Sequence, residues 1–365
     1  MSRNFVYSGS PAHIVFGEGK SATAGEWIKK LGCKRALVLS TPQQKADAEA
    51  LAERLGSLAV GVFSGAVMHT PVDVTATAMK VVAESQADCV VSLGGGSTTG
   101  LGKAIAYRTE LPQIVIPTTY AGSEVTPILG QTEGGRKTTV KDPKILPEVV
   151  IYDATLTTGL PVGLSMTSGL NAMAHAVEAL YAQDRNPIST VMAIEGLRAF
   201  RSALPKIMVA SSDIEARAEG LYGAWLCGTV LGTVGMALHH KICHTLGGTF
   251  DTPHAETHAI MLPHTAAFNA VAVPDLFQPV AEIFGGSVGG GLWDFAKSIG
   301  APLALRDLGL TEADLDKAGQ IAVENPYWNP RPIDRSSIRA LLQQAWEGRR
   351  PENYSSYKGS GRRMK

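Results

Sequence analysis

Residues 89–98 read CVVSLGGGST, and this stretch decides the fold of the first half of the chain. Residues 89–93 are largely apolar without alternation, which is typical of a parallel strand covered by helices on both faces. Three glycines then give a turn that carries no side chains, and Ser97-Thr98 begins a helix. Backbone N–H groups at such a helix start suit the pyrophosphate of a dinucleotide. A turn made for packing alone is the alternative, because the motif is not G-x-G-x-x-G.

Strands and helices alternate on both sides of this stretch. Short β-branched runs predict strands at 35–40, 58–63, 88–93, 113–117 and 149–153, and amphipathic stretches predict helices near 43–55, 73–86 and 98–107. This order predicts an α/β amino-terminal domain with a doubly wound parallel sheet. Residues 128–133 and 136–140, joined by Gly134-Gly135, predict an additional hairpin.

A second polar loop follows the strand at 113–117 and reads TTYAGSE over residues 118–124. One threonine or serine alone is better explained as a loop cap. Two such loops after neighbouring strands favour a ligand site, because ligands bind at the carboxyl edge of a parallel sheet. We therefore expect both loops to bind a nicotinamide cofactor, through Gly94, Gly95, Gly96, Ser97, Thr98, Thr118, Thr119 and Ser123.

The second half of the chain is predicted to be helical. Ala, Leu and Met recur at helical spacing in 165–183, 190–204, 214–236 and 237–246. We expect a dinucleotide-binding α/β domain at 1–158, an all-α carboxy-terminal catalytic domain at 159–350, and a disordered tail at 351–365, which is rich in Gly, Ser and charge.

Composition excludes several classes of partner. The 33 basic and 33 acidic residues balance, so no charge excess favours nucleic acid. No signal peptide and no apolar stretch of membrane-spanning length is found, and the four cysteines form no C-x-x-C pair. These features predict a cytoplasmic enzyme with reduced thiols, acting on a small molecule rather than on nucleic acid or a membrane.

Histidines cluster in the helical half. Asn171 and His175 are four residues apart, so they project from one helix face, and His240 and His244 repeat this spacing on a helix expected to stop at Gly247-Gly248. His254 opens the next helix, where the dipole favours a neutral imidazole. A lone histidine is more often structural, and we interpret four others in that way: His13, His69, His239 and His258. Cys243 is interpreted as a packing residue.

Several motifs resemble the iron-containing alcohol dehydrogenase superfamily, and most closely its maleylacetate reductase branch. The matching stretches are GGGSTTG at 94–100, PTTYAGSE at 117–124, SGLNAMAHA at 168–176, HHKICH at 239–244 and PHAE at 253–256. The resemblance covers nearly the whole chain. It implies a Rossmann-like first domain, a helical second domain, an active site in the cleft between them, and a homodimer.

The resemblance also bears on metal binding. Metal-dependent members use one Asp and three His, and these positions fall at Asn171, His175, His240 and His254. A neutral amide in place of the carboxylate weakens the binding of a hard divalent cation, although three histidines can hold zinc. Because maleylacetate reductases look similar here and are thought to work without metal, we expect no metal.

Two further positions follow from the resemblance. Gly100 stands where alcohol dehydrogenases of the superfamily usually carry Asp, which supports the reductase branch. Thr41 lies where an acidic residue would contact the adenosine ribose and repel a 2′-phosphate. Since Thr41 is neutral, we expect either NADH or NADPH to serve as cofactor.

The resulting hypothesis is reduction of the carbon–carbon double bond of a small dicarboxylate enone, maleylacetate, to 3-oxoadipate. Hydrogen-bond donors must stabilise the enolate that forms, and an imidazolium must protonate the neighbouring carbon. His244 and His254 are the candidates for this role, while His175 and His240 orient the substrate and Asn171 binds one of its oxygens. Tyr120, Thr119 and Lys241 are candidates for binding the substrate carboxylates.

Three other functions fit parts of this pattern. A metal-dependent alcohol dehydrogenase of the same superfamily would contain stoichiometric metal, against which Asn171 argues. A lyase of the dehydroquinate synthase type would use NAD and zinc without a lasting change in nicotinamide absorbance. A catalytically dead protein would bind NADH without turnover, which the dense polar cluster disfavours.

Overall fold

The computed structural model describes residues 5, 7, 9, 12–134 and 136–351. The described part packs into two compact units. Unit 1 comprises the chain up to Ala176 together with Asn186–Val234, and unit 2 comprises Val177–Arg185 and the chain from Gly235 onward. The predicted tail at 351–365 lies, apart from Pro351, outside the described residues.

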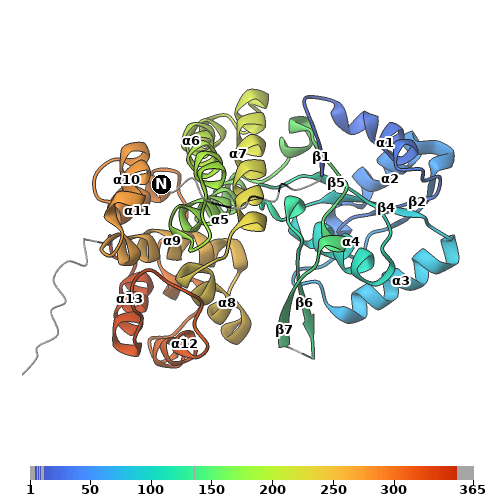
Figure 1. Ribbon diagram of the computed structural model, residues 1–365. Coiled ribbons are helices and arrows are strands. Elements are labelled where there is room, and N and C mark those ends of the chain that lie inside the picture. Colours follow the sequence, from blue (N-terminus) through green and yellow to red (C-terminus); the bar gives the residue numbers. More distant parts are fainter. Residues whose placement is uncertain (1–4, 6, 8, 10–11, 135, 352–365) are drawn as a thin grey trace, which may run out of the picture. The chain divides into compact units, whose positions relative to one another are not determined.

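The centre of the α/β part of unit 1 is a parallel sheet, as predicted (Figure 1). Its strands are short and rich in valine, isoleucine and leucine, and those in the middle are buried on both faces. In spatial order the six strands are β1 (His13–Phe16), β8 (Val149–Tyr152), β5 (Gln113–Pro117), β4 (Cys89–Gly94), β2 (Ala36–Leu39) and β3 (Ala59–Phe63).

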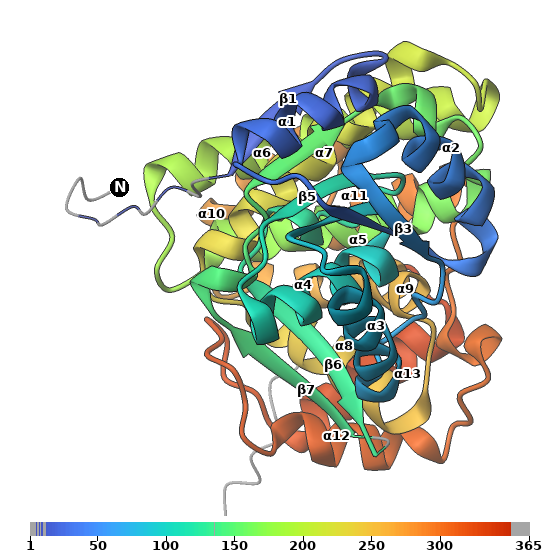
Figure 2. The same cartoon turned by 90° about the vertical axis from the view of Figure 1, so that its right-hand side faces the viewer.

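Helices cover both faces of this sheet, which makes it doubly wound (Figure 2). On one face α1 (Ala24–Lys30) and α2 (Lys45–Leu55) bury their apolar stripes against β2, β4, β5 and β8. On the other face α3 (Val72–Ser85) and α4 (Gly96–Thr109) pack on β2 and β4. Short 3-10 turns join these elements: η1 (Lys20–Thr23), η2 (Pro42–Gln44), η3 (Gly56–Leu58), η4 (Ser123–Val125), η5 (Pro143–Ile145) and η6 (Ala154–Thr157).

The predicted hairpin is confirmed. Strands β6 (Ile128–Glu133) and β7 (Arg136–Lys141) pair antiparallel and form a sheet of their own. Gly134 at the turn has φ 54°, a conformation that glycine adopts without strain.

Three long helices complete unit 1, although one of them crosses into unit 2. They are α5 (Val162–Tyr181), α6 (Pro187–Val209) and α7 (Ile214–Thr233). Helix α7 packs on η4 and η6 of the α/β part, and the backbones of Gly122 and Gly228 touch there. The parallel sheet ends at Tyr152 and α5 begins at Val162, whereas the compact units divide within α5, because α7 packs with the α/β part and α6 packs on α7. The domain boundary at 158 stays a prediction.

The helices of unit 2 surround a core of leucine, isoleucine and alanine side chains. They are α8 (Leu238–Phe250), α9 (His254–Ala270), α10 (Pro274–Phe284), α11 (Val288–Ser298), α12 (Asp314–Val323) and α13 (Arg335–Glu347), with the 3-10 turn η7 (Leu305–Leu308).

Two local predictions were incomplete or wrong. Strand β1 was not predicted, because its four residues are only partly buried and carry no long apolar run. Helix α8 does not stop at Gly247-Gly248 but continues to Phe250, and Asp251, with φ 53°, ends it in the left-handed conformation that usually favours glycine.

Within the described residues no single helix is long and apolar enough to cross a membrane. By length and composition alone, α7 and α8 pass that test only as a bent pair.

The contact between Gly122 and Gly228 yields a stability prediction. A Cβ at residue 228 would overlap the Gly122 carbonyl oxygen, so Gly228→Ala must push α7 away from the loop and lower the free energy of unfolding by about 1–3 kcal/mol. Gly163→Ala is the control, since a Cβ there meets nothing within 4 Å and alanine favours the helix. Urea unfolding measures both, and equal stability of the two variants would contradict this packing.

Candidate active site

The glycine turn lies at the carboxyl end of β4. Close packing leaves no room for a side chain at its first two residues. A Cβ at Gly94 would overlap Thr98 Oγ1, and one at Gly95 would lie 2.7 Å from Thr119 Cγ2. Gly96 differs, because the nearest atom to a Cβ there is 4.0 Å away. Gly94 and Gly95 are therefore closely packed, whereas there is space beside Gly96 at the start of α4.

The second loop lies beside the first, as predicted. Gly94 pairs with Pro117 where β4 and β5 end, and the Thr118 N–H donates to the Gly94 carbonyl oxygen at 3.1 Å. A third segment joins them after β2, because Gln44 Nε2 donates to Thr118 Oγ1 at 3.0 Å. Thr41, which precedes Gln44 at the N-cap position of η2 without a side-chain capping bond, lies at this same edge of the sheet.

Several polar groups at this edge are available to a ligand. Helix α4 has no side-chain cap at its amino terminus. Among the described residues, the buried Thr98 Oγ1 and Ser123 Oγ have no hydrogen-bond partner. Buried hydroxyls normally find partners, so an anionic group that accepts from them fits this position. The residues present thus fit the pyrophosphate of a dinucleotide.

The space beside Gly100 is filled by another part of the chain. Thr70, which is buried and has φ 45°, places its hydroxyl where a Cβ of residue 100 would lie. The Asp usual in alcohol dehydrogenases of the superfamily would not fit here without moving Thr70. Sequence reasoning identified Gly100 but not its partner.

Tyr120 was predicted to contact the substrate, and its position argues against that role. The side chain is fully buried, packs against Phe200, and its hydroxyl accepts from Arg217 Nη1 at 3.1 Å. Arg217 itself is held by Ser165 Oγ at 2.8 Å and by backbone oxygens. Burial raises the pKa of Tyr120, so the phenol stays neutral and supports the loop from inside.

Asn171 and His175 lie on one face of α5, as the spacing predicted. Both side chains are buried, and Asn171 Oδ1 has no hydrogen-bond partner among the described residues. The structure therefore leaves the hydrogen-bonding capacity of this oxygen unused. Glu178 follows one turn later on the same face of this helix, and sequence reasoning missed it.

Glu178 is the centre of polar contacts in unit 2. Its Oε2 accepts from His240 Nδ1 at 2.6 Å and from the Ala237 N–H at 2.9 Å. Its Oε1 accepts from the His239 N–H at 2.8 Å and from Tyr181 at 3.2 Å. Burial alone would raise the pKa of Glu178, but His240 and these hydrogen bonds lower it well below the ordinary value. The carboxylate thus fixes the ring of His240 and the start of α8.

His239 and His258, interpreted from sequence as isolated structural residues, form a buried pair behind His240. Thr265 Oγ1 donates to the Met261 carbonyl, so it accepts from His239 Nδ1 at 2.9 Å. His239 Nε2 is then the acceptor for His258 Nδ1 at 2.9 Å. Burial and the charge of His240 lower the pKa of His239 to about 3, which keeps its ring neutral.

The three predicted histidines of unit 2 come together around this pair. His254 is the first residue of α9, and the centroid of its ring lies 4.4 Å from the ring centroid of His258. The ring centroids of His240 and His258 are 5.1 Å apart, and the ring centroids of His240 and His244 are 5.8 Å apart. His244 Nδ1 also contacts the Tyr327 hydroxyl at 3.3 Å. Unit 2 therefore gathers imidazoles that can donate or accept protons.

The residues present lack the available carboxylate that a hard divalent cation prefers. Asn171 supplies no negative charge, and the neighbouring carboxylate of Glu178 already accepts four hydrogen bonds. Hard cations prefer anionic oxygen ligands. His239, Cys243 and His258 do place three potential ligand atoms within 4.8 Å of one another, but these atoms contact each other directly.

Comparisons with known proteins agree with this architecture. Residues 11–154 match the model of the iron-containing alcohol dehydrogenase family, and residues 165–346 match that of the Fe-containing alcohol dehydrogenase family, C-terminal. The chain is 66% identical to maleylacetate reductase of Rhizobium sp. (strain MTP-10005) and 50% identical to that of Burkholderia cepacia, covering 95% of this chain and 99% of each relative. The crystal structure of maleylacetate reductase from Agrobacterium tumefaciens is similar with a TM-score of 0.94 and 66% identity, over 96% of this chain and 100% of that one.

The contacts of Glu178 yield a second prediction. Glu178→Gln replaces one acceptor oxygen with an NH2 group that faces N–H donors, so the free energy of unfolding should fall by about 1–3 kcal/mol. Tyr181→Phe is the control, because it removes only one donor and leaves three on the carboxylate. Chemical unfolding at pH 7 compares them; a Gln variant as stable as the Phe variant would show that Glu178 does not organise this site.

Proposed function

This chain belongs to the iron-containing alcohol dehydrogenase family, and on that premise we propose that it reduces the carbon–carbon double bond of maleylacetate to give 3-oxoadipate. The full-length similarity to maleylacetate reductases carries the proposal. The amide of Asn171 agrees with it, because the substrate is a dianion that a carboxylate at position 171 would repel.

A nicotinamide dinucleotide, NADH or NADPH, would supply the hydride for this reduction. We assign its phosphates to the start of α4, with Gly96, Ser97 and Thr98 on one side and Ser123 on the other. Thr118 and Thr119 line the loop between these groups. Thr41 is assigned to the adenosine ribose, where a neutral side chain accepts both cofactors.

The histidines supply the proton chemistry. Hydride addition at the alkene carbon β to the ketone leaves negative charge on the ketone oxygen of the substrate, and hydrogen-bond donors must stabilise it. His244 and His254 are proposed to donate to this oxygen and to protonate the adjacent carbon. His240, held by Glu178, and His175 orient the substrate, and the amide of Asn171 binds one of its oxygens.

We further propose that this reaction proceeds without a metal. The argument is the chemistry of the side chains: the position that carries Asp in metal-dependent members is Asn171, and Glu178 is saturated by hydrogen bonds. Enolate stabilisation then falls to the imidazoles. A homodimer remains a prediction from the resemblance.

An assay with the purified full-length protein tests the substrate and the metal together. With maleylacetate, NADH absorbance should fall, the product should be 3-oxoadipate in equal amount, and turnover should stay within about twofold after treatment with a chelator. The control is the same chelator treatment with a metal-dependent alcohol dehydrogenase, which should lose activity. Loss that added iron or zinc restores would contradict the metal-free mechanism, and oxidation of simple alcohols without maleylacetate reduction would contradict the substrate.

A further inference from the structure

Lys103 is a buried cation on the helix that begins with the glycine turn. Its side chain is 1% exposed, two turns into α4. The Nζ atom donates to the Ser123 carbonyl oxygen, to Thr126 Oγ1 at 2.9 Å and to the Ile128 carbonyl oxygen at 2.9 Å. An ammonium has three N–H donors, so every one of them is used.

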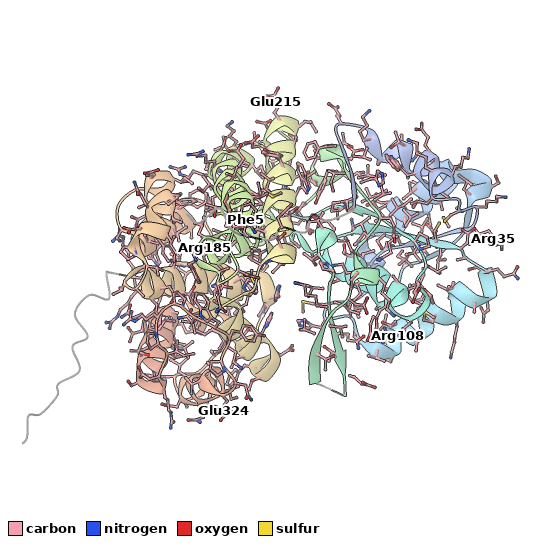
Figure 3. All side chains as sticks on the ribbon, in the orientation of Figure 1. Phe5, Arg35, Arg108, Arg185, Glu215 and Glu324 are labelled. Carbon is pink, nitrogen blue, oxygen red and sulfur yellow. The ribbon has the colours of Figure 1, made fainter. Side chains whose placement is uncertain are left out.

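All three acceptors belong to one segment of chain, the end of the second cofactor loop. Ser123 opens η4, Thr126 ends it, and Ile128 begins β6. The Thr126 hydroxyl also donates to the Ser123 carbonyl at 3.0 Å, which closes the turn on itself. Farther along α4, Arg108 donates to Gln131 Oε1 at 3.0 Å; Arg108 is labelled in Figure 3. Helix α4 is thus tied to this segment at two points.

Burying this charge costs free energy, and one carboxylate partly offsets it. Burial lowers the pKa of Lys103 to about 7, while the charge of Glu124 opposes that shift. Burial likewise raises the pKa of Glu124, whose Oε1 accepts from the Tyr152 hydroxyl at 2.7 Å. An apolar side chain would fill the same space without this cost, so the hydrogen bonds themselves carry the role of Lys103.

The other supports of the loop come from a different direction. Tyr120 is held by Arg217, and Gly122 touches Gly228 on α7. The first residues of the loop are joined to the glycine turn by the Thr118 N–H, which donates to the Gly94 carbonyl oxygen. The last residues are bound to α4 by Lys103, whose Nζ atom donates to the carbonyl oxygen of Ser123, the residue whose hydroxyl has no partner among the described residues.

We propose that Lys103 is a positioning residue for the dinucleotide: it holds Ser123 at a fixed distance from the start of α4, so that both can bind the same phosphates. The inference rests on the proposed cofactor site and does not depend on the identity of the substrate. Its specific consequence is that Lys103 acts on cofactor affinity and not on the chemistry of the histidines.

The test is NADH binding to the purified full-length protein, by fluorescence titration without substrate, followed by steady-state kinetics. Lys103→Met keeps an unbranched side chain, one heavy atom shorter, and removes its donors. We expect Kd and KM for NADH to rise about tenfold or more, with KM for maleylacetate and kcat at saturating NADH within about threefold of wild type. Lys80→Met, an exposed lysine on α3, is the control and should change none of these values.

Thr126→Val provides a milder variant that keeps the shape of the side chain; it removes one acceptor of Lys103 together with the bond from the Thr126 hydroxyl to the Ser123 carbonyl oxygen. Its Kd for NADH should rise about threefold, and it decides the outcome if Lys103→Met does not fold. An unchanged Kd for NADH in the folded variants, or a fall in kcat with unchanged affinity, would overturn the role of Lys103. Wild-type protein that does not bind NADH would instead overturn the proposed function.

Discussion

The pairing of β4 with β5 at their carboxyl ends is the constraint on which the candidate cofactor site depends. The register places Gly94 opposite Pro117, and the Thr118 N–H donates to the Gly94 carbonyl oxygen. Two loops that are separate in sequence are thereby fixed side by side. Glycine is required where they meet, because a side chain at Gly94 or Gly95 would collide with Thr98 or Thr119. The open space over Gly96 is what this packing leaves for a ligand.

The proposed proton chemistry depends on a second constraint, the buried carboxylate of Glu178. A charge with 1% exposure is stable only when its oxygens are satisfied, and four donors from α5, α8 and the residue before α8 satisfy these. The same bonds orient His240 and leave no oxygen available for a cation. A second hydrogen-bonded chain lies beside His240: His258 donates to His239, and His239 donates to Thr265. Fixed imidazoles of this kind are suited to stabilise an enolate.

Sequence patterns predicted the features that depend on neighbouring residues, and they missed contacts between residues far apart in the sequence. The parallel sheet, the hairpin and the glycine turn follow from runs of a few residues, and the motifs identified the family. The contact of His240 with Glu178 spans 62 residues, so no pattern around either one reveals it. Lys103 likewise looks like an ordinary helical lysine until the fold brings its acceptors around it. Tyr120 sits in a loop of ligand-binding type, yet its neighbour Arg217 comes from a distant helix and turns it inward.

The central claim is that the start of α4 binds a dinucleotide, and a single side chain at residue 96 tests it. Gly96 is exposed, has no unusual φ, and a Cβ there meets nothing closer than 4.0 Å, so Gly96→Val should fold with a melting temperature close to that of wild type. The valine would occupy the space assigned to the pyrophosphate. Titration with NADH should then show affinity reduced about thirtyfold or more, a loss of about 2 kcal/mol of binding free energy. Wild-type affinity in a folded Gly96→Val protein would contradict the account.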